Sequence, residues 1–294
     1  MDSLLAKIRL QDDEIAQVKG AHAHLVEVLN SKASNSTLPT AKDFLLTGSY
    51  ARDTKITPLD DVDIFYIIGK ANSVDSHWHT IIDCDFTFGQ EFLDADQNVS
   101  SLKILNLIKK EIGETYGKSE IRRDGEVVNL FLTSYGVGFD ITPVFEISND
   151  DYYLMPEGKG MHKWKKSNPL IDHAHITHLH EKHNYMLKDI ILLAKYWFKR
   201  KRIKSPRSYH LESVAYHLFD SIPPGVYTHT GWLSYLLKNI NKDNHLISCP
   251  DPTGLSEPLS SGLTPEDITN IENEANEAVT HLSQGSDKFI EYVN

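Results

Sequence analysis

The chain has 294 residues, of which 40% are hydrophobic and 24% charged, as in a soluble globular protein with one large or two ordinary domains. Its 30 Lys and Arg against 41 Asp and Glu give a net charge of −11, which argues against stable, sequence-independent binding of DNA or RNA. Two distant cysteines, Cys84 and Cys249, favour a reduced compartment. Residues 1–10 lack the apolar core of a signal peptide, and no apolar run approaches the ~20 residues of a membrane span. We therefore expect a cytoplasmic protein that does not enter a membrane.

The first 30 residues have the spacing of amphipathic helices. Apolar side chains recur at three- and four-residue steps between charged ones over residues 3–30. The pattern predicts one or two helices, followed by a polar loop over residues 31–40.

Two short apolar runs then flank a polar connection. The first ends at Gly48-Ser49, and the second begins with Asp61-Val62-Asp63 and continues to Ile68. Both runs are too short for helices and are predicted as strands. Since side chains at i and i+2 share one face of a strand, Asp61 and Asp63 point the same way and Val62 points to the core. The Gly48-Ser49 turn has the composition to open a helix whose N–H groups hold a phosphate.

A third acid follows on another predicted strand. Within residues 137–145, Phe139 and Ile141 share one face, and Asp140 lies on the other. On a strand that returns to the same sheet, Asp140 would join the first two acids. Like charges this close repel each other unless a cation lies between them, and hard carboxylate oxygens suit Mg²⁺. Ordinary loop chemistry and a solvated surface acid are the structural alternatives; the combined spacing favours a catalytic site.

One further helix is predicted in the first half of the chain, and the second half is predicted to be mostly helical. Residues 100–115, with Ser100 as a cap, residues 183–200, a segment from Ser208, residues 232–240, and a segment from Thr264-Pro265 to about Gln284 are the predicted helices. The last of these is polar, so we expect it on the surface. Residues 146–182 are polar and predicted irregular. The dense histidines of residues 173–183 have no metal-specific spacing and are expected on helix surfaces and in loops.

Residues 200–207, RKRIKSPR, form the one concentrated basic segment. A solvated turn is the simpler explanation; the alternative that we favour is a patch facing the polyphosphate of a nucleotide.

Together these motifs resemble a known family. Gly48-Ser49, eleven residues, and then Asp61-Val62-Asp63, with Asp140 later, is similar to the signature of DNA polymerase β-type nucleotidyltransferases. The longer form, Gly48-Ser49-Tyr50-Ala51-Arg52-Asp53-Thr54-Lys55-Ile56, resembles the bacterial relatives of cyclic GMP–AMP synthase and oligoadenylate synthetase. These are the DncV-like (SMODS) second-messenger synthases of anti-phage (CBASS) signalling.

The resemblance implies roles for eight residues. Asp61, Asp63 and Asp140 would hold two Mg²⁺ ions, with Mn²⁺ as an alternative, about 3.5–4 Å apart. Gly48 and Ser49 would hold the terminal phosphates of the donor nucleotide. From the helical half, Lys195 and Ser208 would grip the triphosphate, and Tyr209 would stack on a base.

The resemblance also implies an α+β fold. A polymerase β-type sheet flanked by helices would fill a catalytic domain over residues 1–165, including the N-terminal helix. A mostly helical nucleotide-binding domain would follow over residues 166–294, with a cleft between them for two nucleotides.

The expected product is a cyclic di- or trinucleotide made from nucleoside triphosphates, ATP among them, and regulatory sensor proteins are expected partners. Rival activities are template-independent extension of an RNA 3′ end, as in CCA- or poly(A)-adding enzymes, and nucleotidyl transfer to a protein or small molecule. A nucleotide-binding module without turnover is a further alternative.

Overall fold

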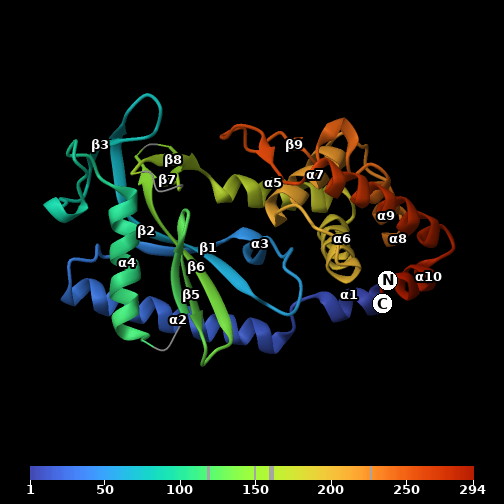
Figure 1. Cartoon of the computed structure of the whole chain (residues 1–294), viewed down its shortest axis with the longest axis horizontal. Helices are drawn as coiled ribbons and strands as arrows, with labels where there is room; N and C mark the ends of the chain where they lie inside the picture. Colours follow the sequence, from blue (N-terminus) through green and yellow to red (C-terminus); the bar gives the residue numbers. More distant parts are fainter. Residues whose placement is uncertain (118–119, 149, 159–161, 226) are drawn as a thin grey trace. The chain divides into compact units, whose positions relative to one another are not determined.

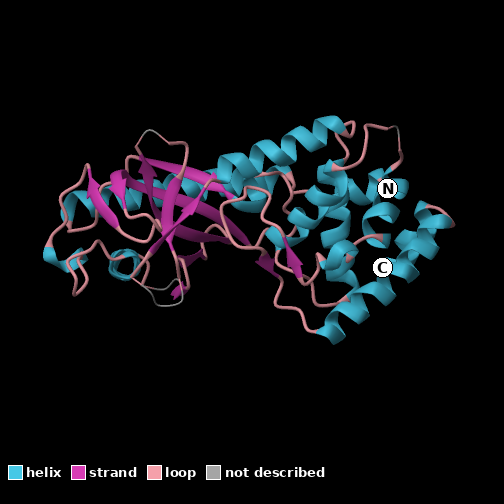
Figure 2. Cartoon of the chain, turned by 90° about the horizontal axis from the view of Figure 1, so that it is seen from above, coloured by secondary structure: helices cyan, strands magenta, loops and turns pink. Residues whose placement is uncertain are grey.

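The computed structural model describes residues 1–117, 120–148, 150–158, 162–225 and 227–294, which form two compact units (Figure 1). The sheet unit comprises Gln11–Tyr50 and Leu59–Pro169. The helical unit comprises Met1–Leu10, Ala51–Pro58 and Leu170–Asn294. The predicted α+β class is confirmed, since one unit is built on a sheet and the other on helices (Figure 2).

The sheet unit is organised on eight strands in the described residues. These are β1 (Asp43–Thr47), β2 (Asp61–Val74), β3 (Ile81–Cys84), β4 (Glu120–Asp124), β5 (Val127–Leu132), β6 (Val137–Ile147), β7 (Tyr153–Pro156) and β8 (Trp164–Ser167). The main path runs β1-β2-β6-β5-β4, while β3 pairs with β2, β7 pairs with β6, and β8 pairs with β7. Strands β2 and β6 are parallel, and every other pair in this sheet is antiparallel. The pairing of β2 with β6 therefore joins the two predicted acid-bearing strands.

Helices α2 (Asp12–Asn35) and α4 (Ser101–Thr115) cover one face of this sheet, as Figure 1 shows; a short 3₁₀ turn, η1 (Gln90–Phe92), precedes α4. The alternating residues Val62, Ile64 and Tyr66 of β2 are fully buried in the core formed with α2 and α4. Burial of apolar area at about 25 cal/mol per Å² holds this face against the helices. The carboxylates Asp61 and Asp63 belong to the opposite face of β2.

The helical unit contains most of the remaining elements. These are α1 (Asp2–Ile8), α5 (Pro169–Lys182), α6 (Leu187–Lys201), α7 (Ser208–Asp220), α8 (His229–Lys238), η2 (Lys242–Asn244), β9 (Ser248–Cys249), β10 (Leu259–Ser260), α9 (Pro265–Ser283) and α10 (Ser286–Val293). The short α3 (Gly48–Ala51) begins directly after β1. Helix α6 lies in the core of the helical unit, where Ile190, Leu193 and Trp197 are fully buried. No helix of the described residues combines the length and the apolar character that crossing a bilayer requires.

Most predicted helices are confirmed, including their capping residues. Ser100 accepts a hydrogen bond from the backbone N–H of Lys103 at 3.2 Å, and Thr264 forms a capping box with Asp267 at the start of α9. The surface position expected for this last helix is confirmed, since many residues of α9 are exposed. Its other face is apolar and packs into the core of the helical unit, where Ile271 and Ala278 are fully inaccessible.

The expectation that residues 146–182 are irregular was wrong. The segment forms β7, β8 and α5 in its described residues. Strands of four residues are too short for a clear alternation pattern, and they gain order because β7 pairs with β6 and β8 pairs with β7. Helix α5 buries few apolar side chains, chiefly Ile176 and Leu179, so its sequence carries little amphipathic signal.

The predicted domain division at residues 165 and 166 stays a prediction. The helical unit begins its long stretch at Leu170 and also includes two short earlier segments, Met1–Leu10 and Ala51–Pro58. Backbone pairing joins these two segments, because Thr57 N–H donates to the carbonyl of Ile8 at 2.9 Å.

Candidate active site

Three predicted acids lie on one face of the sheet. In the parallel β2–β6 ladder Asp63 is paired with Asp140, and Asp61 is paired with Gly138. Adjacent strands are about 4.8 Å apart, and paired residues project to the same side. The predicted return of the strand with Asp140 to the same sheet is therefore confirmed. We call the side of the sheet that carries Asp61, Asp63 and Asp140 the acid face; all three residues are half-buried.

Two glycines allow the backbone to approach these acids. Gly48 has φ of +65°, and a Cβ placed there would lie 1.7 Å from Oδ2 of Asp63. At Gly138 a Cβ would lie 2.7 Å from the carbonyl oxygen of Asp60. Only glycine fits both positions, since real Cβ atoms do not approach within 3 Å. The Gly48-Ser49 turn and the acid pair, separate in sequence, thus meet at one end of β1 and β2.

The donor set on the acid face suits a hard divalent cation. Carboxylate oxygens are the ligands that Mg²⁺ and Mn²⁺ prefer. Within the described residues no three His, Cys, Asp or Glu side chains gather closely enough to ligate one ion, and this also holds for the histidines of α5. The fit of Asp61, Asp63 and Asp140 to such an ion consequently rests on donor chemistry, on the shared face, and on the close approach of the Gly48 backbone to the Asp63 carboxylate, where a Cβ would collide with Oδ2.

Asn129 of β5 is not among the residues predicted from the sequence. This residue is paired with Asp140, and its side-chain amide donates a hydrogen bond to Oδ1 of that acid. The available signal was the polar Asn between Val128 and Leu130, both buried on the opposite face. A lone polar residue in an alternating strand is too common to stand out.

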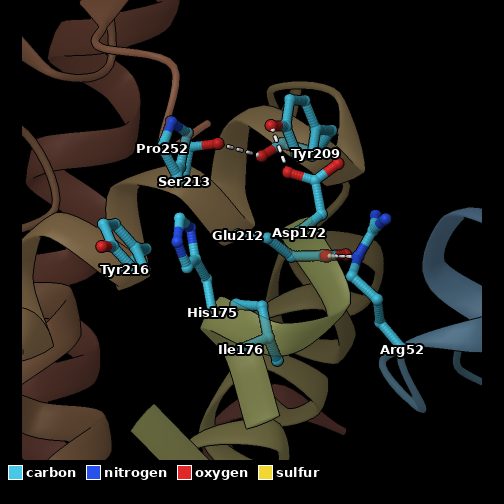
Figure 3. Close-up of a pocket in the computed structure, with 9 residues that line it drawn as sticks. All are labelled: Arg52, Asp172, His175, Ile176, Tyr209, Glu212, Ser213, Tyr216 and Pro252. Atoms are coloured by element: carbon cyan, nitrogen blue, oxygen red, sulfur yellow. Dashed lines mark hydrogen bonds and ion pairs between the residues drawn. The ribbon is translucent and has the colours of Figure 1, made fainter. Parts of the chain in front are cut away.

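Lys195 lies in the helical unit, where it is bound to a buried acid. Its ammonium donates to Oε1 of Glu212 at 2.7 Å and to the carbonyl of Thr54 at 2.8 Å. Arg52 donates from Nε to Oε2 of Glu212 at 2.6 Å (Figure 3), and the hydroxyl of Thr54 donates to Oε1 at 2.9 Å. We call these four residues the Glu212 cluster. Two of the three N–H donors of Lys195 are therefore engaged within the unit.

Electrostatics explains why this cluster is buried as ions. Burial by itself would raise the pKa of Glu212, but the charges and hydrogen bonds of Arg52 and Lys195 outweigh it and hold the pKa at about 2. Burial lowers the pKa of Lys195, against the opposing charge of Glu212. The carboxylate is therefore ionised at neutral pH, and it ties residues 52–54 to α6 and α7.

Tyr209 lines a pocket within the helical unit (Figure 3), whose wall is formed by Arg52, Asp172, His175, Ile176, Tyr209, Glu212, Ser213, Tyr216 and Pro252. The Tyr209 hydroxyl lies 2.7 Å from Oδ1 of Asp172 and 2.8 Å from Oδ1 of Asp251. Burial raises the pKa of Asp172 to about 6. Burial also acts to raise the pKa of Asp251, but hydrogen bonds from Ser256, Tyr209 and Thr253 outweigh it and lower that pKa.

The other predicted contacts of the helical unit have mixed surroundings. Ser208 is exposed at the start of α7. In the basic segment, Lys201 forms an ion pair with Glu274 at 3.2 Å, and Lys204 forms one with Asp267 at 2.7 Å. These pairs favour a structural role for at least part of that segment. The roles of Lys195, Ser208 and Tyr209 in nucleotide binding stay predictions.

Comparison with known proteins supplies the family. Residues 1–182 match the model of the Second Messenger Oligonucleotide or Dinucleotide Synthetase (SMODS) domain. A probable cyclic nucleotide synthase of Bacillus cereus (strain VD146) is 30% identical over 196 residues, which cover 63% of this chain and 58% of that protein. The match thus spans little more than half the length of this curated relative.

Two solved structures show the same fold at low sequence identity. One is the Vibrio cholerae DncV cyclic AMP-GMP synthase in complex with the linear intermediate 5′ pppA(3′,5′)pG, with a TM-score of 0.70 and 12% identity over 95% of this chain and 87% of that one. The other is the E. coli MS115-1 CdnC:HORMA-deltaN complex, with a TM-score of 0.65 and 16% identity over 95% of this chain and 87% of that one. With a family model that matches more than half of its length and a fold shared with both structures, this chain belongs to the SMODS family of nucleotidyltransferases.

Proposed function

We propose that this protein joins nucleoside triphosphates into a cyclic di- or trinucleotide second messenger and releases pyrophosphate. The observation that carries the proposal is the β2–β6 register, in which Asp63 is paired with Asp140 while Asp61 shares their face. Membership in the SMODS family supports the same reaction class.

In this proposal Asp61, Asp63 and Asp140 hold the divalent cations, Mg²⁺ or Mn²⁺. Bound there, such ions favour ionisation of a ribose hydroxyl and neutralise charge on the phosphates. Without cations the three carboxylates would repel a triphosphate, so the acid face selects a nucleotide that arrives with its metal. The ribose oxygen forms a bond to the α-phosphorus, the bond from that phosphorus to the bridging oxygen breaks, and pyrophosphate leaves.

Other residues of the chain would bind and orient the nucleotide. The hydroxyl of Ser49 and the backbone of the turn at Gly48 hold the terminal phosphates of the donor. Ser208 adds a hydroxyl. Lys195 adds a positive charge and the third N–H of its ammonium, since the other two donate to Glu212 and Thr54. Tyr209 offers an aromatic face for a base, an interaction of about 1–3 kcal/mol that tolerates any base.

A signalling role in anti-phage (CBASS) defence follows from this chemistry as part of the proposal. The CdnC relative was solved with a HORMA protein, which supports a regulatory sensor protein as partner of this chain. RNA 3′-end extension is the rival activity, but a net charge of −11 disfavours the long basic track that holding RNA requires.

Incubation of the protein with all four nucleoside triphosphates and Mg²⁺, followed by mass analysis, tests the proposal. We expect a product that resists phosphatase, because a cyclic molecule has no terminal phosphate, and that forms without an RNA primer. Asp63→Asn should lower product formation at least ~1000-fold, as expected for loss of a group that acts in the transition state.

Asp124→Asn is the matched control, because this exposed acid lies at the end of β4 in the same sheet. It should retain full activity. Turnover by Asp63→Asn at the wild-type rate, or a product that requires RNA, would overturn the proposal.

A further inference from the structure

A row of polar side chains crosses the sheet on the acid face. The strand registers pair Thr47 with Asp63, Asp63 with Asp140, Asp140 with Asn129, and Asn129 with Arg122. These five residues come from β1, β2, β6, β5 and β4 in that order, and paired residues share a face. The row therefore extends the acid face beyond the three carboxylates, by two strands on the side of Asp140.

Hydrogen bonds link the outer three members of this row. Asn129 donates from Nδ2 to Oδ1 of Asp140. Arg122 donates from Nε to Oδ1 of Asn129 at 3.2 Å. Arg122 can only donate, so it engages the oxygen end of the amide and leaves the NH₂ end toward the carboxylate. With the amide reversed, the amide oxygen of Asn129 would face the carboxylate oxygen of Asp140, and its NH₂ group would face the guanidinium of Arg122.

The backbone around Asn129 holds its side chain in this place. Its neighbours Val128 and Leu130 are buried in the core on the other side of β5, so the strand cannot turn to present a different face. Asp140 is held in the same way by Phe139 and Ile141, which are fully buried. The amide of Asn129 and the carboxylate of Asp140 thus meet on two strands whose orientations are set by the core.

We propose that Asn129 is a positioning residue: its amide fixes the orientation in which Asp140 presents its carboxylate to a divalent cation, and Arg122 fixes the orientation of the amide. The inference rests on the proposed function of Asp140 as a ligand. Groups that hydrogen-bond metal-ligating carboxylates set their direction, and their loss commonly lowers metal affinity or activity 10- to 100-fold.

The test compares Asn129→Ala and Asn129→Leu with the full-length wild-type chain. Leu has the same branched arrangement of side-chain heavy atoms and no donor, so it separates loss of the hydrogen bond from truncation of the side chain. Binding of Mn²⁺ without nucleotide, followed by electron paramagnetic resonance, should weaken about 10-fold or more in both variants. The Mg²⁺ concentration for half-maximal activity should rise by a similar factor, while KM for nucleotide at saturating Mg²⁺ stays unchanged.

Arg122→Ala should weaken Mn²⁺ binding less, by about 3-fold, because the amide remains but is free to reverse. Arg123→Ala is its control, since Arg123 is paired with Val128 and its side chain lies on the opposite face. An equal effect of the two Arg variants would overturn the role of Arg122.

Wild-type Mn²⁺ binding and Mg²⁺ dependence in both Asn129 variants would overturn the positioning role. In that case an inactive Asp63→Asn would still uphold the proposed function, so the two failures are distinguishable.

Discussion

The two units gather charged side chains in opposite ways. On the acid face of the sheet unit, Asp61, Asp63 and Asp140 share one side of neighbouring paired strands. In the helical unit, Glu212 is buried and accepts hydrogen bonds from Arg52 and Lys195. The first arrangement gathers three half-buried carboxylates on one face, whereas the second surrounds one buried carboxylate with two cationic side chains. Burial and cationic partners therefore indicate a structural role for the Glu212 cluster, while the half-buried acid face is the cluster to which we assign a function in our proposal.

The same contrast predicts different effects on stability. The acids of the sheet unit are only half-buried, so replacing one of them should cost little stability. In the Glu212 cluster the buried ions depend on each other, because removal of one partner leaves an uncompensated charge in a medium of low polarity.

The largest effect is expected for Glu212→Ala. It should lower the free energy of unfolding by about 3–5 kcal/mol, since Arg52 and Lys195 would remain buried without their partner. Urea unfolding followed by tryptophan fluorescence checks this, because Trp197 and Trp232 are buried in the core of the helical unit. Asp63→Asn on the acid face should cost far less stability, because that side chain is only half-buried, while product formation is lost.

The stabilisation by Glu212 should also depend on pH with a defined sign. Its pKa in the folded state is about 2, below the ordinary 4.5, so the stabilisation is complete above about pH 4.5 and is lost as the pH falls toward 2. The Glu212→Gln variant should lack this dependence. Equal stability of the wild type and Glu212→Ala at pH 7 would contradict a structural role for the cluster.

Gly48→Ala is expected to have the next largest effect, a rise of about 2–3 kcal/mol in the activation free energy of product formation. The new Cβ would meet Oδ2 of Asp63 at 1.7 Å and displace that carboxylate, and the positive φ adds about 1 kcal/mol of strain. Product formation should therefore fall about 30- to 100-fold.

Gly136→Ala is the matched control for the strain alone, since Gly136 has φ of +66° and a Cβ there would meet nothing within 4 Å. It should lower the melting temperature slightly and leave activity intact. If the two alanine variants lose activity equally, the contact with Asp63 is not the cause.

Sequence patterns predicted the parts of the molecule that depend on local spacing. The i, i+2 rule placed Asp61 and Asp63 on one face, and alternation around Asp140 placed it to join them. The partners of the Glu212 cluster were not predictable, because Arg52 and Glu212 are 160 residues apart and ion pairing leaves no periodic trace. Asn129 was missed for a related reason: its role depends on a strand register that becomes known only when β5 and β6 are paired.

Asp172→Asn should have the smallest effect, and it tests a half-buried acid of the helical unit that accepts a hydrogen bond from the neutral Tyr209 hydroxyl. Burial raises its pKa to about 6 from the ordinary 3.8, so the folded state holds the proton more tightly and stability falls as the pH rises from about 4 to 6. Asparagine keeps the acceptor for the Tyr209 hydroxyl and carries no charge. The variant should therefore match the wild type at pH 4 and exceed its unfolding free energy at pH 7 by about 1–2 kcal/mol, which is less than the ~3 kcal/mol equivalent to the full pKa difference because Asp172 is partly exposed to solvent.

Urea unfolding at pH 4, 5, 6 and 7 measures this difference, with Asp251→Asn as the control. Asp251 accepts hydrogen bonds from Ser256 and Thr253 as well as Tyr209, and its pKa is lowered, so its loss should destabilise the unit at pH 7. We expect Asp172→Asn to stabilise the unit at pH 7 and Asp251→Asn to destabilise it. The two carboxylates that contact the Tyr209 hydroxyl would then differ, because hydrogen-bond donors stabilise the ionised form of Asp251, whereas ionisation of Asp172 costs stability. Parallel pH curves for the wild type and Asp172→Asn would instead mean that Asp172 carries no excess proton affinity in the folded state. In that case Asp172 would be stable as an ion in the folded helical unit without a cation hydrogen-bonded to it.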